Sequence, residues 1–258
     1  MAFTPYDWNQ AVQQRMDYIE ERLRDGSPVV ALSLPDGVLM VTVHRTQRKL
    51  FEIYDRLMFG GIGNQSDLEA ARMAAIDFAH REGYQRSPDD VTAHRLVGSV
   101  LSPAIKRAFA DPFSAPFVFR GLFAELGDFP AADQFFTLNY DGEFRRETLY
   151  AVAAGASEAE NRMLALLHAH VDQATRREAA LRLALEAWAV GRLHARRAPD
   201  DEEAARPSDA AAVLQDALAT GTLEAALLER HSRRESRFRL LARAELEPAV
   251  ADYRRGAE

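Results

Sequence analysis

The residue types that usually carry chemistry form no complete constellation by spacing alone. The glycine-rich stretch at residues 60–63 suggests a phosphate-binding loop, but it lacks the Lys-Ser/Thr pair of a P-loop and the full dinucleotide-binding spacing. His168 and His170 are two residues apart on a predicted helix, so they point to different faces and cannot hold one metal ion together. The acidic pairs at 89–90 and 200–201 fall at a predicted helix start and in a predicted loop, which explains them without catalysis. We therefore expect no metal and no cofactor.

Lysine is the residue type whose use is unusual. The chain contains only Lys49 and Lys106, and every other Lys/Arg position is arginine. A GC-rich genome explains this bias, together with the many alanines, without a functional reason. The alternative is that lysines were removed because lysine is an attachment point for degradation tags, and that Lys49 was kept for a purpose. Lys49 is therefore a candidate site residue.

Composition narrows the class of protein. The 258 residues, 47% of them apolar, are enough for a sizeable core, and the formal net charge of −7 argues against nucleic acid as the main partner. The sequence has no cysteine, which excludes disulfides and fits a reducing cytoplasm. Neither a signal peptide nor an apolar run of about 18 residues is visible. We therefore expect a cytoplasmic protein that binds neither nucleic acid nor a membrane.

Hydropathy periodicity and turn residues predict alternating groups of helices and strands. In chain order, the expected elements are a helix over 8–24, strand pairs 29–34 with 38–43 and 49–54 with 57–63, helices beginning at 66 and 87, strands over 117–126, 134–140 and 148–154, helices beginning at 157 and 175, a helix over 209–219, and strands over 222–229 and 237–244.

Local signals indicate where several helices begin and end. Asp7 can cap the first helix and Gly26 can end it. Ser/Thr-x-x-Glu capping boxes are expected at 66–69, 157–160 and 175–178. Pro103 must kink or restart the helix that begins at 87, because proline lacks an amide donor. Two groups of strands with helix pairs outside them predict an α+β fold, a four-layer αββα sandwich with an extra N-terminal helix.

Several stretches carry a family resemblance: residues 27–63, the helix over 67–83, Gly83-Tyr84 followed by Asp89-Asp90-Val91-Thr92, and the strand over 138–142. In order and spacing they resemble the α subunit of the bacterial, actinobacterial-type 20S proteasome core, a non-catalytic member of the N-terminal-nucleophile hydrolase superfamily. The resemblance implies one proteasome-type domain over 1–258. It would comprise a gating tail (1–8), an N-terminal helix (8–24) and the αββα sandwich (27–254), with 196–220 as an insertion.

The resemblance also raises the question of catalysis. Catalytic members of the superfamily use a processed N-terminal threonine, or rarely another nucleophile, activated by its own α-amine, a lysine and an acidic residue. On that pattern Ser27, preceded by Gly26, stands at the nucleophile, Val43 at the acid and Lys49 at the lysine. Val43 cannot orient an ammonium group, and Pro28 stiffens the backbone after the serine. The resemblance therefore implies no catalytic residue in this chain.

Two further roles follow from the resemblance. In proteasome α subunits a lysine at the place of Lys49 lies in a pocket between neighbouring subunits. There it pairs with the C-terminal carboxylate of an activator, usually a ring-shaped ATPase, and a compact ammonium suits that partner. The alternative for Lys49 is an ordinary lysine at a strand end. The N-terminal tail, with Phe3, Tyr6 and Asp7, is expected to form a gate over the axial pore.

The expected function is that of a structural and gating α subunit. Its homo-heptameric outer ring would cap the catalytic β subunits, control the entry of protein substrates and dock the ATPase, while the chain itself hydrolyses nothing. The complex would be a threonine-type endopeptidase. The alternative is a self-processing N-terminal serine or threonine peptidase of the same fold, which would lose residues 1–26 and so differ in intact mass. An unrelated αββα scaffold is a third possibility.

Overall fold

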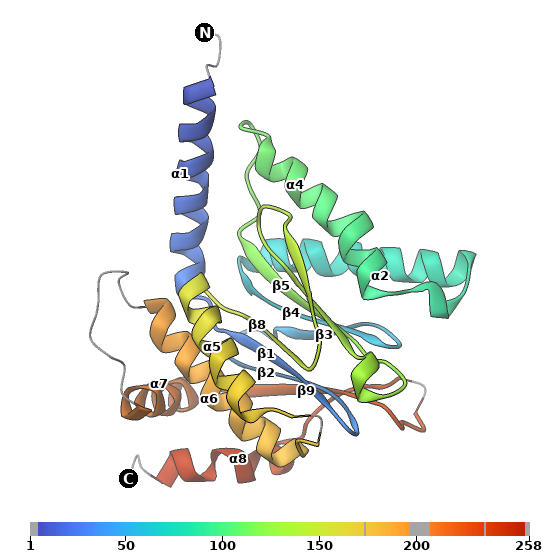
Figure 1. The fold of residues 1–258 in the computed structure, drawn as a ribbon, viewed down its shortest axis with the longest axis vertical. Coiled ribbons are helices and arrows are strands. Elements are labelled where there is room, and N and C mark those ends of the chain that lie inside the picture. The colour runs from blue at the N-terminus through green and yellow to red at the C-terminus, as the bar shows by residue number, and fades with distance from the viewer. Residues whose placement is uncertain (1–4, 173, 197–206, 235, 256–258) are drawn as a thin grey trace.

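The computed structural model describes residues 5–172, 174–196, 207–234 and 236–255, and these form four layers (Figure 1). Two five-stranded sheets lie in the middle, and helices cover both outer faces. The predicted α+β fold, an αββα sandwich with an N-terminal helix, is therefore confirmed. Among the described residues, no helix combines the length and apolarity that a membrane-spanning segment needs.

Both sheets are antiparallel throughout. The first has the order β10-β9-β2-β1-β8, with β1 Val29–Leu34, β2 Gly37–His44, β8 Tyr150–Ala153, β9 Thr222–Glu229 and β10 Phe238–Leu240. The second has the order β3-β4-β5-β6-β7, with β3 Leu50–Tyr54, β4 Leu57–Gly63, β5 Phe119–Glu125, β6 Gln134–Leu138 and β7 Phe144–Glu147. The connection between β2 and β3 thus passes from one sheet to the other.

The helices fall into two groups and one outlier. Over the first sheet lie α5 Ser157–His170, α6 Arg177–Arg196, α7 Pro207–Thr220 and α8 Arg243–Arg255. Over the second lie α2 Gln65–Gln85, α3 Ala93–Arg95, the π-helical segment Leu96–Leu101 and α4 Ser102–Ala110, with short 3₁₀ turns at Pro88–Asp90 and Pro130–Ala132. The outlier is α1, Pro5–Arg24.

Three apolar layers hold the sandwich together, because strand side chains alternate between faces. In β1, Val30 and Leu32 pack against the helices over the first sheet, whereas Val29 and Ala31 pack against the second sheet. In β4, Phe59 joins the layer beneath α2. Strands buried on both faces carry apolar residues without a polar alternation, as the sequence of β1 does.

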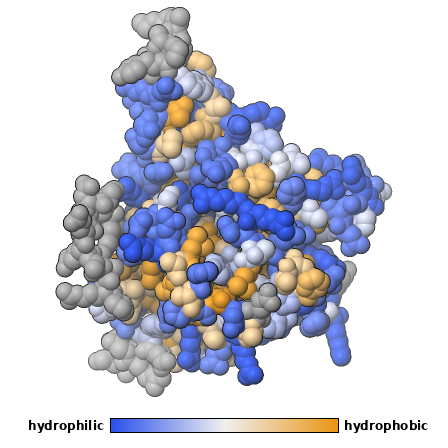
Figure 2. Space-filling view, in the orientation of Figure 1, coloured by the Kyte–Doolittle hydropathy of each residue, from blue (hydrophilic) through white to orange (hydrophobic). Residues whose placement is uncertain are grey.

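The helix α1 is anchored at one end only. Ile19 and Leu23 are fully buried, whereas Trp8 is 39% exposed. Figure 1 shows the first half of α1 standing clear of the sheets, and its outer flank is hydrophilic (Figure 2). The helix begins at Pro5, three residues before its predicted start, because proline fits a first helical turn. Asp7 therefore lies inside the helix rather than at its cap.

None of the three predicted capping boxes forms, because the side chains find other partners. Glu69 pairs with Arg72 one turn further along α2 (2.9 Å). Glu160 turns inward and accepts a hydrogen bond from a backbone amide upstream of α5 (3.1 Å). The hydroxyl of Thr175 donates to Asp172 (3.0 Å), and α6 begins only afterwards. Of these three side chains, Glu160 also has a partner that is distant in the sequence, Arg120 (3.5 Å).

The helix predicted from residue 87 is broken into pieces. Ser87 caps a 3₁₀ turn by accepting from the amide of Asp89 (3.3 Å), as predicted, and Thr92 caps α3. A π-helical segment then leads into α4, which carries Pro103 in its first turn. The hydrogen-bonding pattern thus changes from π to α beside Pro103, where a kink or a restart was predicted because proline lacks an amide donor.

Two elements were not predicted. The turn after β6 leads to β7, a short charged edge strand that pairs with β6, before the chain crosses to β8. The last predicted strand, over 237–244, is wrong beyond Leu240, because the chain turns into α8 at Arg243. Pro248 and several charged residues obscure the helical periodicity of α8. Its buried side chains, Leu246 and Val250, pack into the layer over the first sheet.

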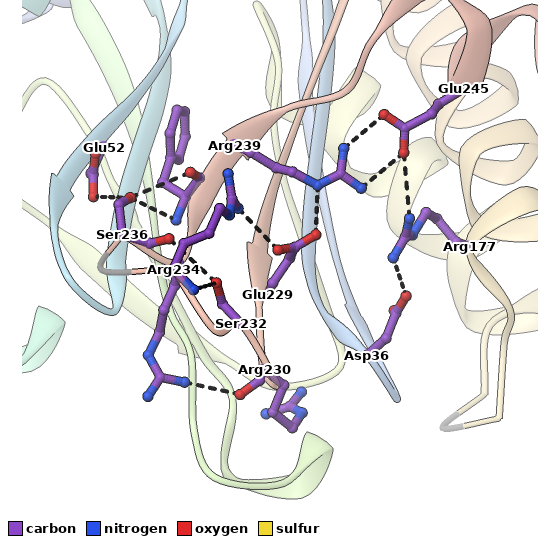
Figure 3. Close-up of polar contacts among 12 residues, drawn as sticks. Asp36, Glu52, Arg177, Glu229, Arg230, Ser232, Arg234, Ser236, Arg239 and Glu245 are labelled. Atoms are coloured by element: carbon purple, nitrogen blue, oxygen red, sulfur yellow. Dashed lines mark hydrogen bonds and ion pairs between the residues drawn. The ribbon is translucent and has the colours of Figure 1, made fainter.

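A polar network fastens the start of α8 (Figure 3). Arg239 donates to both carboxylate oxygens of Glu245 (2.7 and 2.8 Å) and to Glu229 (2.6 Å). Arg177, which also pairs with Asp36, lies 3.6 Å from Glu245. The hydrogen bonds from Arg239 hold the pKa of Glu245 at about 2. This contribution to stability is therefore complete above the ordinary glutamate pKa of 4.5 and is lost as the pH falls toward 2.

A buried ion pair joins the β1–β2 hairpin, the end of β9 and the loop after β5. Arg230 donates through both terminal nitrogens to Asp133 (2.9 and 2.7 Å), and both side chains are almost completely buried. Asp133 also accepts from the hydroxyl of Ser33 (2.6 Å) and from the amide of Gly127 (2.8 Å). Because all partners are satisfied, removal of one leaves an uncompensated buried charge.

Asp133→Ala should therefore lower the free energy of unfolding by about 3–5 kcal/mol, because Arg230 loses its buried partner. Chemical denaturation measures this loss. Asp128→Ala is the matched control, since Asp128 lies in the same loop, is 81% exposed and pairs with Arg56 at the surface. A surface pair of this kind contributes about 1 kcal/mol at most. Equal midpoints for the two variants would contradict the assignment.

Candidate functional site

A cavity of about 740 Å³ opens where several connections between elements meet. Its walls come from the end of α1 and the connection to β1 (22–27), the end of β2 and the β2–β3 connection (43–49), the β4–α2 connection (63–65), α6 (188–196) and α7 (213–220). The chain thus brings together five segments that are far apart in the sequence.

Lys49 lines this cavity and is partly buried. Its Nζ atom donates a hydrogen bond to the backbone oxygen of Ser27 (3.3 Å). Burial lowers the pKa of Lys49 to about 8, with the charge of Arg192 as a second cause, and Glu224 partly opposes both. Lys49 is therefore mostly protonated at neutral pH, but it is an easily discharged cation.

Glu224 on β9 positions the backbone of Lys49. The buried carboxylate accepts hydrogen bonds from the amides of Lys49 (2.9 Å) and Leu50 (3.3 Å), and from the guanidinium of Arg48 (3.4 Å). His44 lies 3.8 Å away. Glu224 was not predicted, although an acidic residue within the apolar strand TLEAALLE was a signal for it. Because the Glu224 oxygens accept from these two amides, they fix the backbone position from which the Lys49 side chain extends.

Ser27, Val43 and Lys49 meet in space, as the family pattern implies, but their contacts differ from those of a catalytic centre. The Ser27 hydroxyl donates to the backbone oxygen of Val43 and accepts from Nε1 of Trp188 (3.0 Å). Lys49 reaches the backbone oxygen of Ser27. In the chain as given, a peptide bond joins the nitrogen of Ser27 to Gly26, and a nucleophile of this class would need that bond cleaved to free its amine. The role of Trp188 was not predicted, because only the fold brings α6 to this position.

The wall beside Lys49 carries an arginine cluster. Arg192 donates to the backbone oxygen of Gly26 (3.3 Å), and both Arg192 (3.6 Å) and Arg196 (3.5 Å) lie near the exposed carboxylate of Asp25. Burial and the charge of Arg196 lower the pKa of Arg192 to about 10. Among the described lining residues, five Lys and Arg side chains are cationic and two Asp side chains are acidic. The cavity is therefore suited to an anion, although the whole chain carries a formal charge of −7.

The predicted gate residues belong to a different part of the chain from the cavity walls. Phe3 falls outside the described residues, and Tyr6 and Asp7 belong to the first turns of α1. Residues 197–206, in the predicted insertion 196–220 and around the acidic pair at 200–201, also fall outside the described residues. The helix predicted over 209–219 is present as α7.

The weaker candidates have structural explanations. Gly60 lies in β4, where an added Cβ would meet the sulfur of Met40 at 2.7 Å, so the glycines serve close packing rather than a phosphate. His168 bonds to the hydroxyl of Tyr150 (3.1 Å) and His170 to the backbone oxygen of Leu166 (2.9 Å). Within the described ranges, no group of three metal-ligating side chains gathers.

Comparison with known proteins places this architecture in a family. The proteasome subunit alpha of Actinosynnema mirum is 34% identical over 184 residues, which cover 70% of this chain and 68% of the relative. That of Parafrankia sp. is 30% identical over 184 residues, covering 70% and 74%. That of Pseudarthrobacter chlorophenolicus is 29% identical over 229 residues, covering 86% of each. No protein-family model matches the chain.

The chain therefore belongs to the proteasome α subunit family, and its relatives are of the actinobacterial type that the sequence predicted. The membership assigns it to the 20S proteasome core and to protein degradation. The relatives do not by themselves assign a role to any residue of the cavity.

Ser27→Ala should destabilise the chain by about 1–3 kcal/mol, because the buried Nε1 of Trp188 loses its acceptor. Peptide hydrolysis by the assembled core should be unchanged, because the Ser27 hydroxyl is hydrogen-bonded to the Val43 oxygen and to Trp188 and is not expected to act as a nucleophile. In a double-mutant cycle with Trp188→Phe the two losses should be less than additive, because each variant breaks the same hydrogen bond. A large loss of hydrolysis with assembly intact would show that Ser27 takes part in catalysis.

Proposed function

We propose that this chain is the structural and gating α subunit of a bacterial 20S core. Copies of it form the homo-heptameric outer ring, which contacts the catalytic β subunits and controls the entry of protein substrates in the cytoplasm. Each chain is one proteasome-type domain with an insertion at 196–220. The chain itself hydrolyses no peptide bond. Family membership supports the place in the core, and the contacts of the Ser27 hydroxyl support the absence of catalysis.

The single observation that carries the docking role is the position of Lys49. Its ammonium lies in a cation-rich cavity large enough for the end of a peptide, and its backbone is fixed by Glu224. A free C-terminal carboxylate supplies the negative charge that this cavity lacks, and an ammonium binds such a group by a charge-assisted hydrogen bond. We propose that the carboxylate belongs to a ring-shaped ATPase that docks on the outer ring.

Lys49→Ala should weaken docking about tenfold or more per site, since a charge-assisted contact contributes about 1.5–3 kcal/mol. Lys49→Arg should rescue only part, because the guanidinium fork is wider than the ammonium that the site holds. Binding should also weaken as the pH rises above about 8, where Lys49 loses its proton. The measurement is ATPase-dependent degradation of a folded substrate beside gate-independent cleavage of a short peptide.

Lys106→Ala on α4 is the matched control and should behave as the parent. Loss of folded-substrate degradation with short-peptide cleavage preserved supports docking. Several tails bind one ring, so losses at each site should compound through avidity. Loss of both activities would assign Lys49 a structural role and contradict the proposal.

The gate is proposed at the free end of α1, with Phe3, Tyr6 and Asp7. Support comes from the way that α1 stands clear of the sheets while its other end is buried (Figure 1). Apolar tails from the copies of a ring can cluster over a central pore and still separate when an activator docks.

Deletion of residues 1–6 should therefore raise the rate of small-peptide hydrolysis by the assembled core, because the pore loses its cover. The anchoring residues Ile19 and Leu23 stay in place, so assembly should persist. Tyr18→Ala, which removes a partly exposed aromatic from the same helix, is the control and should leave the rate unchanged. A truncated core no faster than the parent would show that these residues are not a closed gate.

A self-processing peptidase is the alternative that the proximity of Ser27 and Lys49 favours. It predicts a mature chain that begins at Ser27, and the α subunit predicts one that retains residues before it. An intact mass of the purified core distinguishes the two.

A further inference from the structure

Two cations share one wall of the cavity. Lys49 donates to the backbone oxygen of Ser27 and Arg192 to that of Gly26, each at 3.3 Å, so the two charged groups bind successive peptide oxygens. They come from the β2–β3 connection and from α6, which only the fold brings together. The charge of Arg192 is among the causes that lower the pKa of Lys49, as expected for two neighbouring cations that repel each other.

The acidic groups nearby offset the charge of this pair only in part, since Glu224 acts on Lys49 while Asp25 and Asp216 act on Arg192. Asp25 is 83% exposed and is shared between Arg192 and Arg196. Glu224 directs its oxygens to the amides of Lys49 and Leu50. Asp216, on α7, also lines the cavity, and Arg45, on the same β2–β3 connection as Lys49, adds a further positive charge.

This excess of positive charge leaves Lys49 and Arg192 able to bind more than one carboxylate. A single carboxylate bound at Lys49 compensates the charge of Lys49 alone. The guanidinium of Arg192 then still has Asp25 as its partner, which is exposed and shared with Arg196. A guanidinium binds a carboxylate through two parallel N–H groups, whereas an ammonium binds as a point charge. The two cations thus offer two different anion sites side by side.

We propose that Arg192 is a second anion-binding residue of the cavity, and that the cavity selects a peptide end with two negative charges. The terminal carboxylate binds at Lys49, and the acidic side chain of the last residue binds at Arg192. This inference rests on the proposed docking function and defines the chemistry of the partner's tail.

The test uses fluorescent heptapeptides that differ only at the C-terminus: Glu with a free carboxylate, Gln with a free carboxylate, and Glu with a terminal amide. Binding is measured by anisotropy on the assembled core. The Glu acid should bind the parent about tenfold more tightly than the Gln acid, the gain of one charge-assisted pair. Arg192→Gln should reduce this ratio to about one, and Arg192→Lys should restore part of it, as expected for a charge effect.

Arg182→Gln is the matched control, because Arg182 lies on the same helix and pairs with Glu178 at the surface. It should leave the ratio unchanged. A Glu-to-Gln ratio that survives Arg192→Gln, or a ratio of one on the parent, overturns the role of Arg192. A third outcome also overturns it: the Glu and Gln acids bind equally and millimolar inorganic phosphate displaces both. Lys49 and Arg192 would then bind one compact dianion together.

The amide-ended peptide separates this inference from the proposed function. If it binds the parent as tightly as the Glu acid, the terminal carboxylate is not recognised and the docking role of Lys49 fails. If the acid binds more tightly than the amide but the Glu and Gln acids bind equally, docking stands and only the second site is wrong.

Discussion

The carboxylate of Glu224 is the constraint on which the cavity depends. It projects from β9 of the first sheet and accepts the backbone amides of Lys49 and Leu50, where the chain enters the second sheet. The β2–β3 connection crosses between sheets at this point, so its end would otherwise be free to shift. A buried carboxylate that binds two amides fixes the backbone, and the Lys49 ammonium is then aimed at the Ser27 oxygen.

The same geometry supports the proposal that this chain has no catalytic role. The three positions of the catalytic pattern remain neighbours, but their hydrogen bonds have been redirected. The Ser27 hydroxyl donates to the backbone oxygen of Val43 and accepts from Trp188. The Glu224 carboxylate accepts from the backbone amide of Lys49. The ammonium of Lys49 is desolvated and charged, as the proposed recognition of an anionic tail requires.

The sequence predicted the strands best and the side-chain partnerships least. Strands Val29–Leu34 and Thr222–Glu229 begin and end as predicted, because turn residues bound continuous apolar runs. Elements with a weak periodic signal, β7 and α8, were missed. The capping boxes failed because a local pattern competes with tertiary partners, and Glu160 shows this by turning into the protein. Lys49 was proposed as a candidate from its rarity and the family pattern. Arg192 and Trp188 could not be proposed in that way, because α6 is distant in the sequence and only the fold brings it to the cavity.

Lys49 is a desolvated cation beside a second cation, and the chain offers a direct way to observe it. Only two lysines are present, so selective carbon-13 labelling of lysine gives two side-chain signals, with Lys106 as the internal reference. A pH titration by nuclear magnetic resonance should show the Lys49 signal changing with a midpoint of about 8. Removing the neighbouring charge in Arg192→Gln should move that midpoint upward. A Lys49 midpoint at the ordinary lysine value of 10.5, unchanged in the variant, would contradict the pairing of the two cations.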